Sequence, residues 1–326
     1  MNIKGLLFVC DADAYKNLEW FLTNVVIPGG YSHLVPLLVY ESERYPEINP
    51  WGKRSLNISQ LREINMRCKK HNITIIPHCD NFRKIPISYP DLAENSGVPS
   101  AACPRNEKYR NMSARLIDEI VEVFHPQYFQ VGLDEINQNL VPYNNFKRVD
   151  QFGICPMCRT NTAAELFAEE TNRLNRFLKT KGCKTMIWGD QLLFSPQFGE
   201  VYHEQGMLGE YTWQALSMMD RDVIICDWHY QNFGQEQLYP SIDYFAGNGF
   251  TVVGCPSVYS VENVKGFTRY YLAKGHDDKL PGMIMTFWGK VARRSESKED
   301  CKYGFIDDSN NLEAILLAGK LFNGKC

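Results

Sequence analysis

Eight short apolar runs, separated by helical patterns, constrain the fold of this chain more than any other feature of its sequence. Most runs are near-continuously hydrophobic, as in parallel strands buried on both faces. Between them, apolar residues recur at helical spacing, as at Leu116, Ile120 and Val123. Strands that alternate regularly with helices predict an α/β fold, a single (β/α)8 TIM barrel. The runs span residues 5–10, 34–40, 73–79, 128–133, 185–188, 223–228, 250–255 and 283–288.

Helices are indicated between several of these runs. Apolar spacing predicts helices over 106–124, around 166–178 and over 311–322, and Asn57 is a suitable N-cap for another. An open doubly wound sheet is the alternative architecture. That fold usually has a glycine-rich phosphate turn after its first strand, where this chain has Asp-Ala-Asp-Ala at 11–14. No repeat or low-complexity tract interrupts the sequence, so we expect one domain over 1–326.

Composition excludes several classes of protein. Hydrophobic residues make up 44% and charged residues 22%, which is ordinary globular usage and excludes disorder. A net charge of −3 offers no basic excess for phosphates, so we expect no nucleic-acid partner. No apolar run reaches the roughly 18 residues of a membrane helix, so we expect no membrane partner. The first run stops at Asp11, too early for a signal peptide, and we expect a cytoplasmic protein.

The eleven cysteines have two possible explanations, buried thiols or a disulfide framework. Several lie inside expected strands, namely Cys10, Cys79, Cys226 and Cys255. In a chain without a leader we expect reduced, buried thiols.

A separate pair, Cys155 and Cys158, forms one C-x2-C motif. It supplies two of the four ligands of a structural zinc, and no second pair follows, although Cys103 and the histidines are further possible ligands. We expect no cofactor and no metal, with Cys155 and Cys158 as the zinc candidates.

Carboxylates and large aromatic residues follow the expected strands. The active site of a barrel is formed at the C-terminal ends of its strands. Aromatic rings stack on the C–H faces of sugars while carboxylates handle hydroxyls and protons, so this set predicts a small carbohydrate or glycoconjugate substrate. Single members have plainer explanations, since Asp11 is also a good helix N-cap and His78 a possible core residue. The strand-end residues are Asp11, Asp13, Glu41, Glu43, His78, Asp80, Asp134, Glu135, Trp188, Asp190, Trp228, His229, Tyr230, Ser257, Tyr259 and Trp288.

The adjacent pair Asp134 and Glu135 is the most informative of these. Two neighbouring carboxylates repel each other when buried. Consecutive strand residues also point to opposite faces. Both side chains can reach one site only if the strand ends there and the chain curls over the barrel. We therefore expect Asp134 and Glu135 to be catalytic.

At these residues the chain resembles glycoside hydrolase family 20, the β-N-acetylhexosaminidases. Residues 131–135 (VGLDE) resemble the Gly-x-Asp-Glu signature, and 76–80 (IPHCD) stand where the family has a proline-rich third-strand end. The segments 186–190 (MIWGD), 228–230 (WHY) and 286–288 (TFW) resemble the family's tryptophan segments on strands five, six and eight. The absence of an accessory N-terminal domain resembles the short hexosaminidase D-type branch.

The resemblance implies hydrolysis of terminal β-linked N-acetylhexosamine, GlcNAc or GalNAc, with retention. The substrate's acetamido oxygen attacks the anomeric carbon and forms an oxazolinium intermediate, so no enzyme nucleophile is needed. The resemblance makes Glu135 the general acid and base and Asp134 the partner of the acetamide N–H. Tyr230 would donate to the acetamido oxygen. The substrate-binding residues would further include Trp188, Trp228, Trp288, Asp190, Glu41 and His78.

The chain departs from the family pattern at two strand ends. No arginine within 11–17 matches the one that holds sugar hydroxyls, and Asn-Phe-Arg at 81–83 replaces the usual Gly-His. Two other functions stay open. One is an ordinary two-carboxylate retaining barrel glycosidase, for which Glu262 lies too far beyond strand seven. The other is a non-catalytic sugar-binding barrel.

Overall fold

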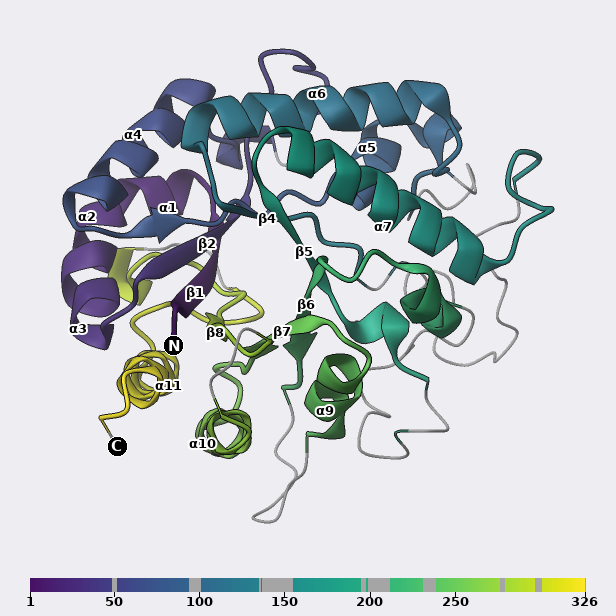
Figure 1. The fold of residues 1–326 in the computed structure, drawn as a ribbon. Coiled ribbons are helices and arrows are strands. Elements are labelled where there is room, and N and C mark those ends of the chain that lie inside the picture. Colours follow the sequence, from purple (N-terminus) through teal and green to yellow (C-terminus); the bar gives the residue numbers. More distant parts are fainter. Residues whose placement is uncertain are drawn as a thin grey trace.

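The computed structural model describes residues 1–48, 52–93, 101–134, 136, 155–194, 198, 212–230, 239–275, 279–296 and 301–325. Its eight strands are parallel and surround a central axis, with the helices outside them (Figure 1). Hydrogen-bonded neighbours follow the order β3-β2-β1-β8-β7-β6-β5-β4. The strands are β1 Ile3–Cys10, β2 His33–Leu38, β3 Thr74–Ile75, β4 Tyr128–Gln130, β5 Lys184–Trp188, β6 Ile224–Trp228, β7 Thr251–Cys255 and β8 Gly282–Thr286.

The ring of strands closes between β3 and β4, the two ends of that order. The backbone N–H of Cys79 donates to the carbonyl of Gln130 over 3.0 Å, and the N–H of Gln130 donates to the carbonyl of Pro77 over 2.9 Å. His78 and Gln130 form the corresponding parallel bridge. A closed sheet has no free edge. The expected (β/α)8 barrel is confirmed, and the alternative of an open sheet is wrong.

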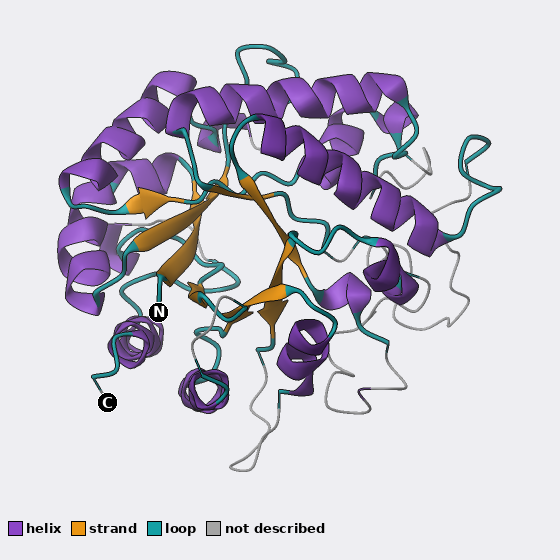
Figure 2. Cartoon of the chain, viewed as in Figure 1, coloured by secondary structure: helices purple, strands orange, loops and turns teal. Residues whose placement is uncertain are grey.

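The helices cover the outside of the barrel, as Figure 2 shows. Asn57 begins α4 with a capping box, because its side chain accepts from the N–H of Gln60 and the Gln60 side chain accepts from the N–H of Asn57. No helix among the described residues is long and apolar enough to cross a membrane. The α-helices are α1 Ala12–Lys16, α2 Leu18–Phe21, α3 Ile27–Gly29, α4 Ile58–Lys70, α5 Asn81–Ser88, α6 Glu107–Phe124, α7 Ala163–Thr180, α9 Pro240–Gly247, α10 Val261–Ala273 and α11 Ser309–Phe322.

Four strands, β2, β3, β4 and β8, end before the apolar runs that predicted them. β3 is interrupted before Pro77, which has no N–H to donate to a ladder. β4 ends at Gln130 and β8 at Thr286, although their apolar runs continue to Leu133 and Trp288. The extra apolar residues are buried or half-buried beyond the strands. The apolar runs thus predicted the buried residues correctly, but they overestimated how far the paired strands extend.

The core has two layers, one inside the barrel and one between the barrel and the helices. The interior is filled by side chains, as is usual in barrels of this type. The half-buried Tyr128, Trp228 and Trp288 pack against this interior cluster. The interior cluster consists of Ile3, Leu7, Val35, Ile76, Met186, Trp188, Ile224, Cys226, Val253, Cys255 and Ile284.

The four cysteines that were expected in strands are buried and form no disulfide, and three of them, Cys10, Cys226 and Cys255, lie in strands while Cys79 follows β3. Burial raises the pKa of Cys10, Cys79 and Cys255. A protonated, buried thiol is chemically inert. These four residues therefore act as small apolar core residues, as the sequence predicted.

We expect a phosphine reductant to leave the melting temperature of the protein unchanged, because these thiols are already reduced. Calorimetry with and without the reductant measures this directly. A structural disulfide would stabilise the fold by about 2–4 kcal/mol. A reductant-dependent fall of several degrees would therefore contradict the prediction.

Candidate active site

The chain leaves strand geometry at the end of β4, directly before Asp134. Gly132 has a φ of +81° and Leu133 a φ of +68°, so two consecutive residues are left-handed. Leucine rarely adopts this conformation, and such strain amounts to about 1–3 kcal/mol. The Leu133 side chain is 1% exposed, and its packing in the core holds the turn. Asp134 is half-buried beyond the turn, and Glu135 lies outside the described residues.

Gly132 also makes a close approach that only glycine permits. A Cβ placed on Gly132 would lie 2.8 Å from both Cβ and Cγ of Asp80, a buried residue that follows β3. The Gly132 N–H donates to Oε1 of Gln130 over 3.0 Å, and its carbonyl accepts from the N–H of Trp188 over 3.1 Å. The turn therefore joins the C-terminal ends of three neighbouring strands, β3, β4 and β5.

The three predicted tryptophans stand at three strand ends. Trp188 ends β5 and is 2% exposed, while Trp228 ends β6 and Trp288 follows β8, both half-buried. The ring centroids of Trp188 and Trp288 lie 6.1 Å apart. The ring of His78, itself buried, packs edge-on against Trp188 at 5.7 Å. The structure thus brings these four residues together at the C-terminal end of the barrel.

Tyr230 is oriented by two of these tryptophans. The indole N–H of Trp288 donates to the Tyr230 hydroxyl over 3.0 Å, and the Tyr230 ring lies 4.8 Å from the ring of Trp228. Burial raises the pKa of Tyr230 well above its ordinary value, so the phenol stays protonated at neutral pH. A hydroxyl that accepts one hydrogen bond still has its own proton to donate. Thr286 lies within hydrogen-bonding reach of the same hydroxyl, and donation by Tyr230 to a bound ligand stays a prediction.

Asp190 and Glu41 differ in their surroundings. The buried Asp190 carboxylate accepts from the indole N–H of Trp228 over 3.2 Å and from the Gln191 side-chain amide over 2.9 Å, one on each oxygen. Asp190 therefore orients Trp228. Glu41 is exposed beyond β2, and within the described part of the chain no hydrogen bond or ion pair joins its side chain to another predicted site residue. For both residues, contact with sugar hydroxyls stays a prediction.

His229 was expected at the strand-end site, and this expectation is wrong, because His229 belongs with Asp227 to an outward-facing polar group behind β6. Asp227 and His229 alternate with Trp228 and Tyr230 and contact the N-terminus of α9. Nε2 of His229 lies 3.0 Å from Oδ1 of Asp227 and 2.8 Å from Oγ of Ser241, and that hydroxyl donates to Oδ2 of Asp227 over 2.6 Å. All three side chains are at most 1% exposed. A nucleophilic triad needs access to substrate, so this group instead fixes the backbone that presents Trp228 and Tyr230.

Two cations at the end of β1 were also missed, because no motif marks them. Nε of Arg54, from the turn Gly52–Arg54, lies 3.1 Å from Oδ2 of Asp11, and Nζ of Lys290 lies 4.0 Å from Oδ2 of Asp13. Asp11 also caps α1 by accepting from the N–H groups of Asp13 and Ala14, as its sequence position predicted. An arginine thus does stand at this strand end, although none occurs within 11–17.

A (β/α)8 barrel with carboxylates and clustered tryptophans at its strand ends is typical of an enzyme that acts on carbohydrate. The family model for the glycosyl hydrolase family 20 catalytic domain matches residues 39–303. The chain belongs to glycosyl hydrolase family 20, as its strand-end segments predicted. No curated protein matches it.

Solved structures share the fold. A β-N-acetylhexosaminidase from Bacteroides fragilis has a TM-score of 0.67 at 15% identity, covering 98% of this chain and 66% of that one. A chitobiase from Flavobacterium johnsoniae has a TM-score of 0.66 at 15% identity, covering 98% and 48%. Dispersin B has a TM-score of 0.59 at 16% identity, covering 98% of both chains. The chain therefore spans less than two thirds of the length of the first two proteins.

We expect Gly132→Ala to lower kcat/KM by about 10²-fold, because the new Cβ would displace Asp80 and the turn before Asp134. Gly182→Ala is the matched control, since Gly182 has a φ of +74° with no atom within 4 Å of its ideal Cβ. Both variants should lose about 1–2 kcal/mol of stability through backbone strain. Steady-state kinetics measure the loss of activity, and melting curves measure the loss of stability separately. Equal activity in the two variants would show that the Asp80 contact does not position the site.

Proposed function

We propose that this protein is an exo-glycosidase that removes terminal β-linked N-acetylhexosamine, GlcNAc or GalNAc, by substrate-assisted catalysis with retention. Membership of glycosyl hydrolase family 20 supports the class of reaction. A fold relative from Vibrio harveyi, described as an exo-β-N-acetylglucosaminidase, was solved in complex with N-acetylglucosamine, which supports the class of sugar.

The left-handed turn at Gly132 and Leu133 is the observation that carries this proposal. In a continuing strand, Asp134 and Glu135 would point to opposite faces. The turn ends strand alternation immediately before the pair, which removes that restriction. Strain in a buried backbone segment is retained where a site depends on it. The turn thus favours a mechanism in which two adjacent carboxylates serve one sugar.

In this mechanism the two carboxylates have different tasks. Glu135 protonates the leaving glycosidic oxygen and then deprotonates the incoming water. Asp134 stays ionised, accepts the acetamide N–H and stabilises the positive charge that develops on the oxazolinium ring. Tyr230 donates to the acetamido oxygen and holds it in line with the anomeric carbon, which is a positioning effect.

The aromatic residues form the binding surface in this proposal. Trp188, Trp228 and Trp288 contact the acetyl group and the sugar ring, since indole faces stack on apolar sugar faces. Their existing contacts with Asp190, His78 and Tyr230 limit their rotation before any ligand arrives. Such preorganisation reduces the entropy lost on binding. Asp190 and Glu41 are proposed to hold ring hydroxyls, with His78 as a further contact.

The main alternative, an ordinary retaining glycosidase, needs a second carboxylate near the anomeric carbon. Such enzymes hold their two carboxyl groups about 5–5.5 Å apart. The residues that follow β7 are Pro256, Ser257 and Tyr259, and the next carboxylate, Glu262, lies in the first turn of α10, 3.4 Å from Lys265. This arrangement disfavours an enzyme nucleophile from β7.

We expect Glu135→Gln to lower kcat by about 10²–10⁴ for substrates with poor leaving groups. Activated aryl glycosides should lose less, because their leaving groups need little protonation. Glu262→Gln is the control, since Glu262 is exposed and has no task in this mechanism. Kinetics across a series of aryl leaving groups provides the measurement. An equal loss for all leaving groups would remove Glu135 from the role of acid.

We expect a thiazoline analogue of the oxazolinium intermediate to bind far more tightly than the monosaccharide product, because it resembles the high-energy species. Asp134→Asn and Tyr230→Phe should weaken thiazoline binding and lower kcat in parallel. For Tyr230→Phe the loss should be about 1.5–3 kcal/mol, the value of a hydrogen bond to a charged partner. Tyr128→Phe, at the N-terminal end of β4, is the control and should change neither quantity.

The substrate range distinguishes the remaining functions. β-Glucosides have no acetamide and should be essentially inert, whereas chromogenic β-GlcNAc or β-GalNAc should be hydrolysed. A covalent sugar adduct formed from a 2-fluoro glycoside, or rapid hydrolysis of a β-glucoside, would instead establish the ordinary retaining mechanism. Binding of the sugars without turnover would identify a non-catalytic sugar-binding barrel.

A further inference from the structure

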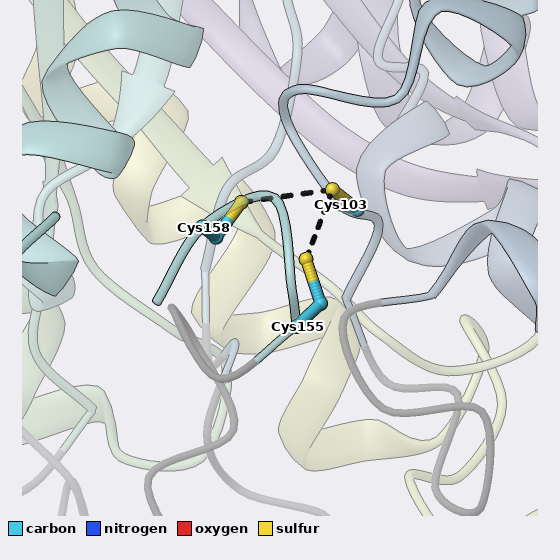
Figure 3. A group of neighbouring side chains, drawn as sticks. All are labelled: Cys103, Cys155 and Cys158. Carbon is cyan, nitrogen blue, oxygen red and sulfur yellow. Dashed lines mark hydrogen bonds between the residues drawn. The ribbon is translucent and has the colours of Figure 1, made fainter. Parts of the chain in front are cut away.

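Three cysteine sulfurs converge in the segments that lead into two helices, α6 and α7. Sγ of Cys103 lies 3.4 Å from Sγ of Cys155 and 3.6 Å from Sγ of Cys158, and all three sulfurs lie within 4.8 Å of one another. Figure 3 shows the side chains turned toward one another from two separate chain segments. Cys103 and Cys158 are buried, and Cys155 is half-buried.

These distances fit a shared metal ion better than a covalent bond between sulfurs. A disulfide requires about 2.05 Å between its sulfurs. Zinc–thiolate bonds of about 2.3 Å at tetrahedral angles place the sulfurs about 3.8 Å apart. The two shortest sulfur–sulfur distances, 3.4 and 3.6 Å, lie close to that value.

The backbone holds the sulfurs in place through tight turns on both segments. The N–H groups of Cys158 and Arg159 both donate to the carbonyl of Cys155, over 2.9 and 3.0 Å. On the other segment, the N–H of Cys103 donates to Leu92, and its carbonyl accepts from Asn106, the N-cap of α6. Each sulfur is therefore fixed by a turn that leads directly into α6 or α7.

The charge around the cluster suits thiolates. The guanidinium of Arg105 donates to Glu169 over 2.9 and 3.1 Å and to Asn161 over 2.6 Å. Arg105 also lies close enough to Cys158 and Cys103 to interact electrostatically with their sulfurs. Zn²⁺ with three thiolates carries a net charge of −1, and Arg105 would offset it.

We propose that Cys103, Cys155 and Cys158 are three ligands of a structural zinc ion that ties the start of α6 to the start of α7. Sites with several thiolates and tetrahedral geometry select zinc among the common divalent ions. A fourth ligand, from the protein or from water, completes the tetrahedron. The ion takes no part in the sugar chemistry, and it stabilises the folded state because the unfolded chain lacks the preformed site.

Metal analysis of purified variants tests the assignment. Wild-type protein produced with zinc in the medium should contain about one zinc ion per chain by elemental analysis. Cys103→Ser and Cys158→Ser should lose nearly all of it. Cys68→Ser matches Cys158 in full burial and Cys301→Ser matches Cys155 in partial burial, and both should retain the metal. Zinc-free wild-type protein, or equal zinc in all variants, would overturn the proposal.

A second measurement uses only wild-type protein, in case the variants fail to fold. Removing the metal with a chelator should lower the melting temperature, and adding back Zn²⁺ should restore it. Co²⁺ in place of zinc should give a thiolate-to-cobalt charge-transfer absorption. A disulfide between Cys103 and Cys155 in protein kept with zinc under reducing conditions, or no response to chelator and Zn²⁺, would overturn the zinc site.

Discussion

The backbone hydrogen bonds between β3 and β4 are the constraint on which the rest of the structure depends. The N–H of Cys79, in the segment that follows β3, donates to Gln130 of β4, and the N–H of Gln130 donates to Pro77 of that segment. These bonds turn an eight-stranded sheet into a ring. Only a closed ring directs all eight strand ends to one place. Immediately beyond this seam the chain turns at Gly132 and presents Asp134. Closure of the fold and placement of the proposed catalytic pair therefore occur within a few residues of each other.

Hydrogen bonds between side chains of different strands fix the aromatic residues at this end of the barrel. Asp190, after β5, holds the indole of Trp228 on β6, and Tyr230 is held by the indole of Trp288 after β8. Behind β6, the buried group of Asp227 and His229 secures the same segment to α9. The segment that carries Trp228 and Tyr230 is thus fixed from both faces of the sheet. A sugar would meet rings whose positions are already set, so little side-chain entropy would be lost when the sugar stacks on them.

The fold could be predicted from the sequence because each strand and helix of a barrel has its own local sequence pattern. Continuous apolar runs located every strand, and the strand-end rule located Trp188, Trp228 and Trp288. The left-handed conformation of Leu133 could not be predicted, because nothing in a leucine indicates positive φ and only its packing maintains it. Contacts between distant segments were also out of reach. Arg54 meets Asp11 across 43 positions and Cys103 meets Cys155 across 52, so the sequence offered Cys103 only as one of several further possible ligands beside the C-x2-C motif.

The ladders of the barrel differ greatly in length, and this affects how the molecule moves. β1 and β2 pair over six residues and β6 and β7 over five, whereas β2 and β3 pair over two and the seam has a single bridge. Local opening begins where the fewest hydrogen bonds must break. The seam is therefore the part of the barrel that opens at the lowest free energy. Because Asp80 and the turn at Gly132 lie beside it, warming would disturb the geometry of the site while most of the barrel is still folded.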